Sequence, residues 1–379
     1  MEIYYQPSKI YFECDSLNQL PNILKKYGKK IFIVTTPDEP LVPLYNRVKA
    51  LCEDNGLEYL HFDQVTPNPS STMIEKGHEM LNAYHADVVL AVGGGSSIDT
   101  AKVLALTNQD ETIDWDMLFE KFDSPYGDYG VYSENVLPII SVPTTSGTGS
   151  QVTQAAVISR NHDKCTIYHP QCISKEVILD PSLVATLPLK MSMATGFDAF
   201  THAFESYLNV HHSVYSRFDS VNAIKMICEY LPKLHEEITN IEYRKYMSLS
   251  DTLAGKALSN SGADIPHPLS EIIGGITNMT HGVALACVFV PFVSVMNDKH
   301  KEDFAKLADI MDPSKSNHEA KELTDIVADF MESIGMNVSL KTMGVTQDQF
   351  DEICNSPILH HLPFASYEEC IKILEQSYE

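Results

Sequence analysis

The 379-residue sequence predicts an α/β domain followed by a mostly helical domain. Short, nearly continuous apolar runs alternate with segments of helical spacing in the first half, which is typical of a parallel sheet covered on both faces. The strand signal largely vanishes after residues 177–181, and long helical patterns follow. Pro181 and Pro188 mark this change, so we place the boundary at residue 183 and expect domains at 1–183 and 184–379.

The expected elements follow in chain order. In the first domain we expect strands at 31–34, 88–92 and 137–142, and helices at 42–53 and 72–84 between the first two strands. This order is a βαβ arrangement in which helices cover the sheet. In the second domain the apolar spacing predicts helices at 191–207, 216–230, 242–258, 302–311 and 318–334.

The composition and charge disfavour several classes of binding partner and several cellular compartments. With 51 acidic and 27 basic side chains the formal net charge is −24, which disfavours a nucleic-acid groove or an anionic membrane surface. The chain has no run of 18 apolar residues, and residues 1–5 lack the layout of a signal peptide. Its eight cysteines are isolated and form no CxxC pair. We therefore expect a cytoplasmic globular enzyme.

A glycine-rich segment joins an expected strand to an expected helix at residues 91–99, with the sequence AVGGGSSID. Consecutive glycines let backbone amides approach an anion, and the following helix presents its free N–H groups and positive dipole end. Glycine clusters also occur in plain flexible turns. Ligands of such folds bind at the carboxyl ends of parallel strands, and this position favours a phosphate site.

A second segment of this kind, SVPTTSGTGS at residues 141–150, also follows a strand run. Its hydroxyl groups and two glycines suit hydrogen bonds to phosphate or ribose oxygens, although such loops are often only solvated turns. Neither segment fits GxGxxG or GxxxxGK[ST], so neither a standard Rossmann nor a P-loop protein is indicated.

Candidate metal ligands are concentrated in the second half. Asp198 and His202 are four residues apart, which places them on one face of a helix. His267 and His281 follow, and Gly274-Gly275 with Asn278 predict a helix break that lets the two imidazoles converge. One carboxylate and three imidazoles suit Fe(II), Zn(II), Co(II) or Mn(II). The chain has 15 histidines, and most histidines in proteins are not ligands, so spacing alone leaves this site open.

Taken together, these segments resemble the iron-dependent (group III) alcohol dehydrogenases over nearly the whole chain. The matching pieces, in matching order, are Pro67-Asn68-Pro69, the 93–102 loop, the 143–150 loop, Leu179-Asp180-Pro181, Asp198-Ala199-Phe200-Thr201-His202 and His267…His281-Gly282. The resemblance implies a dinucleotide-binding α/β domain, an all-helical metal domain, and an active site in the cleft between them. It also implies a homodimer.

Residue by residue, the resemblance implies metal ligands at Asp198, His202, His267 and His281. For the NAD(P) cofactor it implies contacts from two loops and their neighbours, namely Thr36, Asn68, Gly94, Gly95, Ser96, Asp99, Thr144, Thr145, Thr148 and Lys164. The metal is expected to be Fe(II), with Zn(II), Mn(II) or Co(II) as alternatives.

Four positions depart from the family pattern, namely Glu271, Thr36, Gln151 and the turn at residues 12–15, and the first two bear on function. Many members carry a second histidine one turn after the third ligand, often as a proton relay, and this chain has Glu271 there. Many members also place an aspartate after the first strand, where it binds the adenosine ribose. Here that position is Thr36, and Asp38 follows two residues later. We expect NAD(H) to be the better cofactor, with NADP(H) partly tolerated.

The expected activity is hydride transfer between NAD(P)(H) and a small primary alcohol or aldehyde. We expect an aldehyde reductase acting on a short polar or anionic aldehyde, with Glu271 as the candidate catalytic residue. Two alternatives belong to other classes. The first is a metal- and NAD-dependent lyase of the 3-dehydroquinate synthase type, but the chain lacks the cluster of basic residues that a phosphorylated substrate requires. The second is a non-catalytic nucleotide-binding relative, which the intact ligand positions disfavour.

Overall fold

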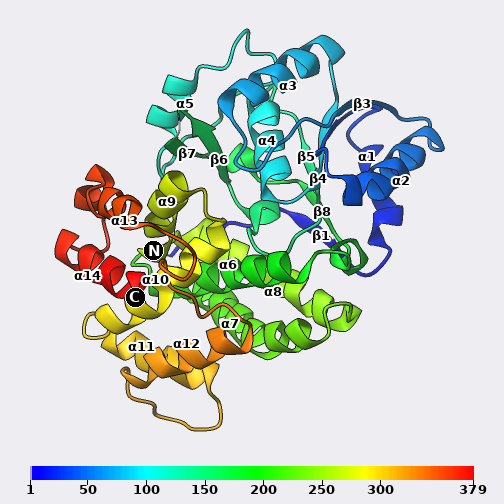
Figure 1. Cartoon of the computed structure of the whole chain (residues 1–379). Helices are drawn as coiled ribbons and strands as arrows, with labels where there is room; N and C mark the ends of the chain where they lie inside the picture. Colours follow the sequence, from blue (N-terminus) through cyan, green and yellow to red (C-terminus); the bar gives the residue numbers. More distant parts are fainter. Residues whose placement is uncertain (1, 162) are drawn as a thin grey trace. The chain divides into compact units, whose positions relative to one another are not determined.

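The computed structural model describes residues 2–161 and 163–379, and Figure 1 shows their path. The chain forms two compact units. Residues 5–187 make an α/β unit, and residues 188–379 make a helical unit that also includes the N-terminal residues up to Tyr4. The units change at Pro188, after a short 3-10 helix at Pro181–Val184, whereas the sequence pattern indicated residue 183.

A six-stranded parallel sheet forms the centre of the α/β unit, in the order β1-β8-β5-β4-β2-β3. Its strands are β1 (Lys9–Phe12), β2 (Lys30–Val34), β3 (Glu58–Phe62), β4 (Val88–Gly93), β5 (Ile139–Pro143) and β8 (Glu176–Leu179). Because every neighbouring pair is parallel, the carboxyl ends of all six strands lie at one edge of the sheet.

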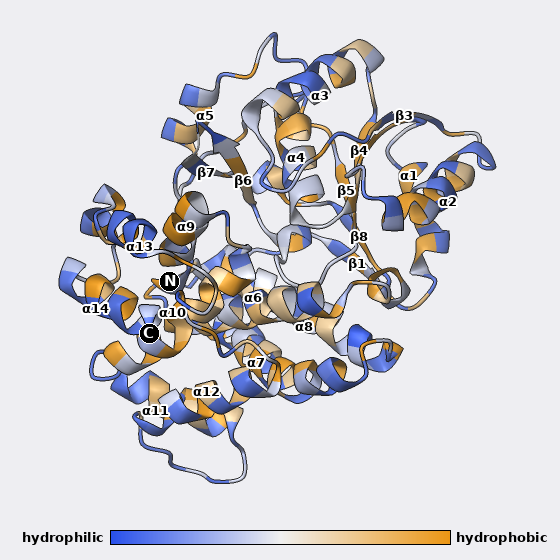
Figure 2. Ribbon diagram, viewed as in Figure 1, coloured by the Kyte–Doolittle hydropathy of each residue, from blue (hydrophilic) through white to orange (hydrophobic). Residues whose placement is uncertain are grey.

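Each face of this sheet is covered by helices, as Figure 1 shows. Successive side chains of β2 point to opposite faces of the sheet. Phe32 therefore packs in one buried cluster, and Ile31 and Ile33 pack in the other. The buried strands appear as apolar segments in Figure 2. Helices α1 (Leu20–Leu24) and α2 (Val42–Glu53) contribute to one cluster, while the other receives α3 (Ser71–Tyr84), α4 (Gly95–Leu106) and α5 (Trp115–Lys121).

A separate antiparallel hairpin of β6 (Ala155–Arg160) and β7 (Asp163–Tyr168) packs against α4. Sequence analysis did not predict this hairpin. Its residues Ala156, Ile158 and Ile167 join the buried cluster that contains α3 and α4. The hairpin therefore extends the hydrophobic core on the α4 face of the sheet.

In the part of the chain that the structure describes, the helical unit contains no strand. Its helices surround one buried cluster rich in phenylalanine and leucine. They are α6 (Leu189–Leu208), α7 (Val214–Glu236), α8 (Ile241–Ser261), α9 (Pro266–Thr277), α10 (His281–Val295), α11 (Lys301–Met311), α12 (Glu322–Ser333), α13 (Gln347–Cys354) and α14 (Tyr367–Tyr378). Figure 2 shows the apolar character of α10, which lies within this cluster. Among the described helices, none is long and apolar enough to cross a membrane.

One expectation about a helix boundary is confirmed in part, and another was wrong. The break expected between His267 and His281 lies at Asn278, where α9 ends with a left-handed φ of 55°, whereas the pair Gly274-Gly275 remains helical. The helix expected from residue 318 begins only at Glu322. His318 is instead held in the preceding loop, where its Nδ1 lies 2.8 Å from Asp309 Oδ1.

Candidate metal centre and dinucleotide site

Helix α6 presents the first two candidate ligands. Asp198 and His202 lie one turn apart near its middle, where the helix is almost completely buried. The imidazole Nε2 of His202 lies 3.6 Å from Asp198 Oδ1. The i, i+4 spacing therefore places both side chains on one face, as the sequence predicted.

Helices α9 and α10 supply the other two. His267 stands in the first turn of α9, and His281 is the first residue of α10. A Cβ atom on Gly282 would lie only 2.2 Å from the carbonyl oxygen of Ala194 on α6. Only glycine permits this close approach, which brings the beginning of α10, and His281 with it, against α6.

The four predicted ligands meet around one oxygen atom. Asp198 Oδ1 lies 3.5 Å from Nε2 of His267 and 3.5 Å from Nε2 of His281, in addition to its 3.6 Å contact with His202. The imidazole rings of His202 and His267 are stacked with centroids 4.5 Å apart. Two ligands about 2.1 Å from an ion in tetrahedral geometry lie about 3.4 Å from each other. The separations from Asp198 Oδ1 therefore fit a shared divalent ion, and the ligand atoms of Asp198, His267 and His281 all lie within 4.8 Å of one another.

Two buried polar atoms support this assignment. Within the described residues, Asp198 Oδ1 and His267 Nε2 are buried and have no hydrogen-bond partner. Leaving such atoms unpaired in a protein interior costs about 1–3 kcal/mol each, so groups of this kind normally indicate an ion or another binding partner. The donor set of one carboxylate and three imidazoles suits a first-row divalent metal.

The electrostatics of the cluster follow from burial and proximity. Burial alone would raise the pKa of Asp198, but the three imidazoles outweigh it and lower the pKa to about 2. Burial would likewise lower the pKa of His267, but the carboxylates of Glu205 and Asp198 raise it to about 10. Without a metal, His267 is therefore held as a cation beside Asp198 and Glu205, and a divalent ion would take the place of its Nε2 proton.

Sequence analysis missed the side chains behind the ligands. Glu205 is fully buried, and its Oε1 accepts a hydrogen bond from Nδ1 of His267 at 2.6 Å. The Ser270 hydroxyl lies 3.2 Å from Nδ1 of His281 and donates its own hydrogen to the carbonyl of His267. With Nδ1 bonded in this way, each imidazole directs Nε2 toward Asp198. The i, i+4, i+7 spacing of Asp198, His202 and Glu205 was the available signal.

In the α/β unit the two predicted loops come together. β4 and β5 are neighbours, and Thr144 N–H donates to the carbonyl of Gly93 at 3.1 Å. A Cβ on Gly94 would lie 3.2 Å from Thr145, and one on Gly95 would lie 2.8 Å from Thr148. The two loops therefore lie against each other with no room for a side chain at Gly95.

The beginning of α4 suits an anion. Its N-cap residue is Gly94, so no side chain caps the first amides of the helix. Gly94, Gly95 and Ser96 remain partly accessible, as do Thr145 and Thr148 beside them. Free amides, a positive helix end and adjacent hydroxyl groups together fit a pyrophosphate.

Asp99 has a different environment from the rest of this group. Its Oδ1 accepts from the Ser150 hydroxyl at 2.5 Å, and its Oδ2 accepts from the amide of Val157 at 3.0 Å. The fully buried Lys102 bonds Ser150 and Thr153 and lies 3.6 Å from Asp99. Burial raises the pKa of Asp99 and lowers that of Lys102. Both Asp99 oxygens thus hold the second loop and the hairpin in place.

The remaining cofactor candidates lie at the same edge of the sheet or on the hairpin. Thr36 follows β2, and its hydroxyl donates to Asp38 at 2.7 Å. Asn68, at a left-handed φ of 53°, follows β3 and is exposed. The amide of Ser159 donates to the carbonyl of Pro69 at 2.8 Å, and Ser159 pairs with Lys164 across the hairpin. The Asn68 turn and Lys164 are therefore neighbours.

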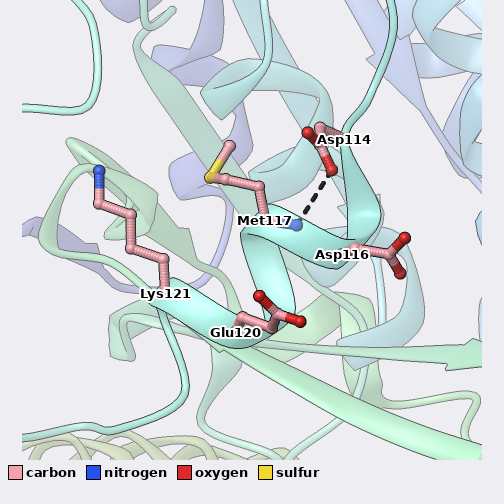
Figure 3. Close-up of a pocket in the computed structure, with 5 residues that line it drawn as sticks. All are labelled: Asp114, Asp116, Met117, Glu120 and Lys121. Atoms are coloured by element: carbon pink, nitrogen blue, oxygen red, sulfur yellow. Dashed lines mark hydrogen bonds between the residues drawn. The ribbon is translucent and has the colours of Figure 1, made fainter.

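A surface pocket over α5 has none of these features (Figure 3). Its lining includes three carboxylates, but Asp114 caps the helix by accepting from the Met117 amide, and Asp116 pairs with Arg160. These side chains stabilise α5, and we assign the pocket no role.

Comparison with known proteins identifies the chain. A model named "Iron-containing alcohol dehydrogenase" matches residues 7–181, and one named "Fe-containing alcohol dehydrogenase family, C-terminal" matches residues 192–374. The chain belongs to the iron-containing alcohol dehydrogenase family.

Individual relatives agree with this family across almost their whole length. NADH-dependent butanol dehydrogenase A of Clostridium acetobutylicum is 28% identical over 99% of both chains. NADPH-dependent butanol dehydrogenase of Clostridium saccharobutylicum is 29% identical over 91% of this chain and 87% of its own. The crystal structure of an archaeal halo-thermophilic Red Sea brine pool alcohol dehydrogenase has a TM-score of 0.88 at 27% identity, covering 100% of this chain and 99% of its own.

Membership of the iron-containing alcohol dehydrogenases confirms the expected enzyme class and fold. The chain is an oxidoreductase, and neither the lyase nor the non-catalytic alternative is favoured. The parallel sheet followed by a helical unit is the architecture of the related structures. The first family model ends at residue 181 and the second begins at residue 192, and the boundary of the compact units at Pro188 lies between them.

Proposed function

We propose that this alcohol dehydrogenase interconverts a short polar aldehyde and its primary alcohol with NAD(H), using Fe(II) held by Asp198, His202, His267 and His281. The α/β unit would bind the dinucleotide, and the helical unit would bind the metal. One observation carries the proposal: three imidazole Nε2 atoms lie within 3.6 Å of Asp198 Oδ1, and that oxygen is buried without a hydrogen-bond partner among the described residues.

When bound, the ion supplies a Lewis acid for the substrate oxygen, and the nicotinamide supplies or accepts the hydride. The protein orients both. The Gly94–Ser96 amides and the hydroxyls of Thr145 and Thr148 would hold the pyrophosphate, and buried packing around α6 excludes water from the ligands. Glu271, one turn after His267 on the unbroken α9, is the residue we propose to move the proton to or from the substrate oxygen.

For the cofactor we propose a preference for NAD(H). Asp38 is exposed beyond the carboxyl end of β2, and the hydroxyl of Thr36 holds its carboxylate at 2.7 Å. A carboxylate at a strand end of a dinucleotide site can bind a ribose hydroxyl and repel a 2′-phosphate. The related butanol dehydrogenases are named for NADH in one case and NADPH in the other, so the family name does not decide this choice.

The substrate proposal is a short, polar aldehyde rather than an anionic one. Asp198, Glu205 and Glu271 bring three carboxylates to the ligand-bearing helices. With one divalent ion the formal charge of this set is −1, which disfavours an anionic substrate.

The experiment is an NADH oxidation assay, followed at about 340 nm, under anaerobic conditions with Fe(II), Zn(II) or Mn(II). We expect steady turnover with short aldehydes and higher kcat/KM for polar uncharged members of a panel than for carboxylated ones. No turnover with any aldehyde and any of these metals would contradict the proposal.

We also propose a cytoplasmic homodimer. All eight cysteines are free thiols, which suits a reducing compartment. The beginning of α7 exposes Val214, Tyr215 and Phe218 by 64–71%, and such apolar side chains are typical of association surfaces. Light scattering after size-exclusion chromatography should give twice the 42.3 kDa chain mass.

A further inference from the structure

Glu205 lies on the same face of α6 as two proposed metal ligands. It follows Asp198 by seven residues and His202 by three, so the three side chains occupy successive turns of one helix. Asp198 and His202 direct polar atoms to the cluster around Asp198 Oδ1, while Glu205 contacts the far side of the His267 ring. One helix therefore supplies two ligands directly and holds a third through its imidazole.

The Glu205 carboxylate is fully buried, and both of its oxygens accept hydrogen bonds. Oε1 accepts from His267 Nδ1 at 2.6 Å, and Oε2 accepts from the Asp264 amide at 2.8 Å. A buried carboxylate is expensive unless it is paired, and here the imidazole N–H and the amide compensate for it. The amide bond fixes the carboxylate, which in turn fixes the imidazole ring.

This contact determines which ring nitrogen of His267 is available. Nδ1 keeps the hydrogen donated to Glu205, so a divalent ion would displace the proton on Nε2, which lies 3.5 Å from Asp198 Oδ1, and bind its lone pair. A charge-assisted hydrogen bond is shorter and about twice as strong as a neutral one, and it makes the imidazole a stronger electron donor. By contrast, the contact at Nδ1 of His281 is the neutral hydroxyl of Ser270, at the longer distance of 3.2 Å.

We propose that Glu205 is a positioning residue that fixes the tautomer and orientation of His267 and thereby sets the affinity of the site for its divalent ion. This inference rests on the proposed metal site. It assigns Glu205 no contact with substrate or cofactor. Loss of a partner of this kind weakens metal binding about 10–100-fold.

The test is Co(II) titration of the metal-depleted protein, followed by visible absorption of the bound ion and by calorimetry. Glu205→Gln keeps the size of the side chain and removes its charge, and we expect its Co(II) dissociation constant to rise about 10–100-fold. Ser270→Ala is the matched control, because it removes a neutral hydrogen bond from a different ligand. We expect Ser270→Ala to weaken binding less than Glu205→Gln.

Glu205→Asp keeps the charge but withdraws the carboxylate by one methylene, and it carries the test if Glu205→Gln does not fold. We expect weaker Co(II) binding and an altered absorption spectrum for this variant as well. A residue that only stabilises the fold would lower the melting temperature of the metal-depleted protein and leave the dissociation constant and spectrum unchanged, and that result would overturn the inference.

The wild-type titration separates this inference from the proposed function. If the wild-type protein binds no Co(II), the proposed metal site is contradicted, and so is the role of Glu205 that rests on it. If the wild type binds Co(II) and Glu205→Gln binds it equally well, only the role of Glu205 is overturned.

Discussion

Glu271 lies four residues after His267 on α9, and that helix continues without a break to Thr277. The two side chains therefore project from the same helix face. If Glu271 carries the proton, Glu271→Gln should lower kcat about 10²–10⁴-fold, because general acid–base catalysis contributes an effect of that size. Metal content should be preserved, as measured by elemental analysis. An unchanged kcat and pH profile would show that Glu271 only lines the site.

Cofactor discrimination should depend on Asp38. Replacing it with asparagine removes the charge while keeping an acceptor for the Thr36 hydroxyl. We expect the ratio of kcat/KM for NADH over NADPH to fall about tenfold or more in Asp38→Asn, the size expected for a hydrogen bond to a charged group. Thr36→Asp is a poorer test, because Thr36 is buried and an aspartate there would face Asp38 directly. A wild-type preference for NADPH would contradict the proposal.

The residues that sequence analysis could place are those whose partners are close in the chain. Asp198 and His202 share a helix face because of their spacing alone. The contact between Glu205 and His267 joins residues 62 positions apart, and helical periodicity carries no information about which distant side chain meets that face. Glu205 could therefore be recognised as a candidate for burial, but its role needed the structure.

At the scale of elements, the loop after β4 packs closely against the loop after β5. In Gly95→Ala the added methyl would lie 2.8 Å from Thr148, so the loop after β5 must move away from α4. We expect KM for NADH to rise, while Co(II) binding in the helical unit stays unchanged. Gly275→Ala is the control, because a Cβ there meets nothing within 4 Å. Equal KM values for Gly95→Ala and the wild type would place the pyrophosphate elsewhere.

His169, directly after β7, should make the α/β unit sensitive to acid. His169 is buried against Phe122 and Tyr129, and burial lowers its pKa to about 4 from an ordinary 6.5. The folded state thus favours neutral imidazole. This stability is fully present above pH 6.5 and is lost as the pH falls toward 4, by at most about 3 kcal/mol.

Trp115 is the only tryptophan of the chain and stands on α5, so its fluorescence reports unfolding of this region. We expect the urea midpoint to fall more between pH 7 and pH 5 in the wild type than in His169→Asn. In the wild type, His169 Nδ1 accepts a hydrogen bond from the Gln171 amide at 3.1 Å. Asparagine also offers an acceptor for this amide, but its side chain does not titrate. Identical pH dependence in the two proteins would contradict this prediction.

Elements with a clear apolar period were predicted well. Helix α2 has the predicted bounds of 42–53, and β4 extends the predicted strand only to Gly93. The differences from the predicted bounds have local causes. Asn278 ends α9 because it adopts a left-handed conformation, whereas Gly274 and Gly275 remain helical. The β6–β7 hairpin was not predicted because β7 is mostly polar and partly exposed, and because the turn contains Asn161, at a left-handed φ of 51°, without a glycine signal.

At the scale of the whole molecule, the metal ligands and the dinucleotide loops belong to different compact units. Chelation should therefore abolish turnover while NADH binding, measured by fluorescence, remains nearly intact. Fe(II) should restore activity. A ligand present at 100 times its dissociation constant stabilises the fold that binds it by about 2.7 kcal/mol, so the metal should also raise the melting temperature. Full activity in a preparation shown to be metal-free would contradict the metal site.

The fold class could be predicted because the change from strand-length apolar runs to helical spacing is a property of long segments. The assignment of the first residues could not be predicted in this way. Residues up to Tyr4 belong to the helical unit, where the Tyr4 hydroxyl donates to Asp219 at 2.6 Å and the Val214 amide donates to Glu2 at 3.1 Å. These are single contacts between residues far apart in the sequence, and no periodic pattern predicts them.

That placement has a consequence for biosynthesis. Tyr4 and Asp219 are 215 residues apart, so the ribosome releases Tyr4 long before its partner exists. The α/β unit, residues 5–187, can fold during this interval, while the segment before it has nowhere to dock until α7 is complete. An affinity tag fused ahead of Glu2 would accordingly disturb the metal-binding unit, although it is attached next to the dinucleotide-binding one. A tag at the carboxyl end of α14 avoids this late docking step altogether.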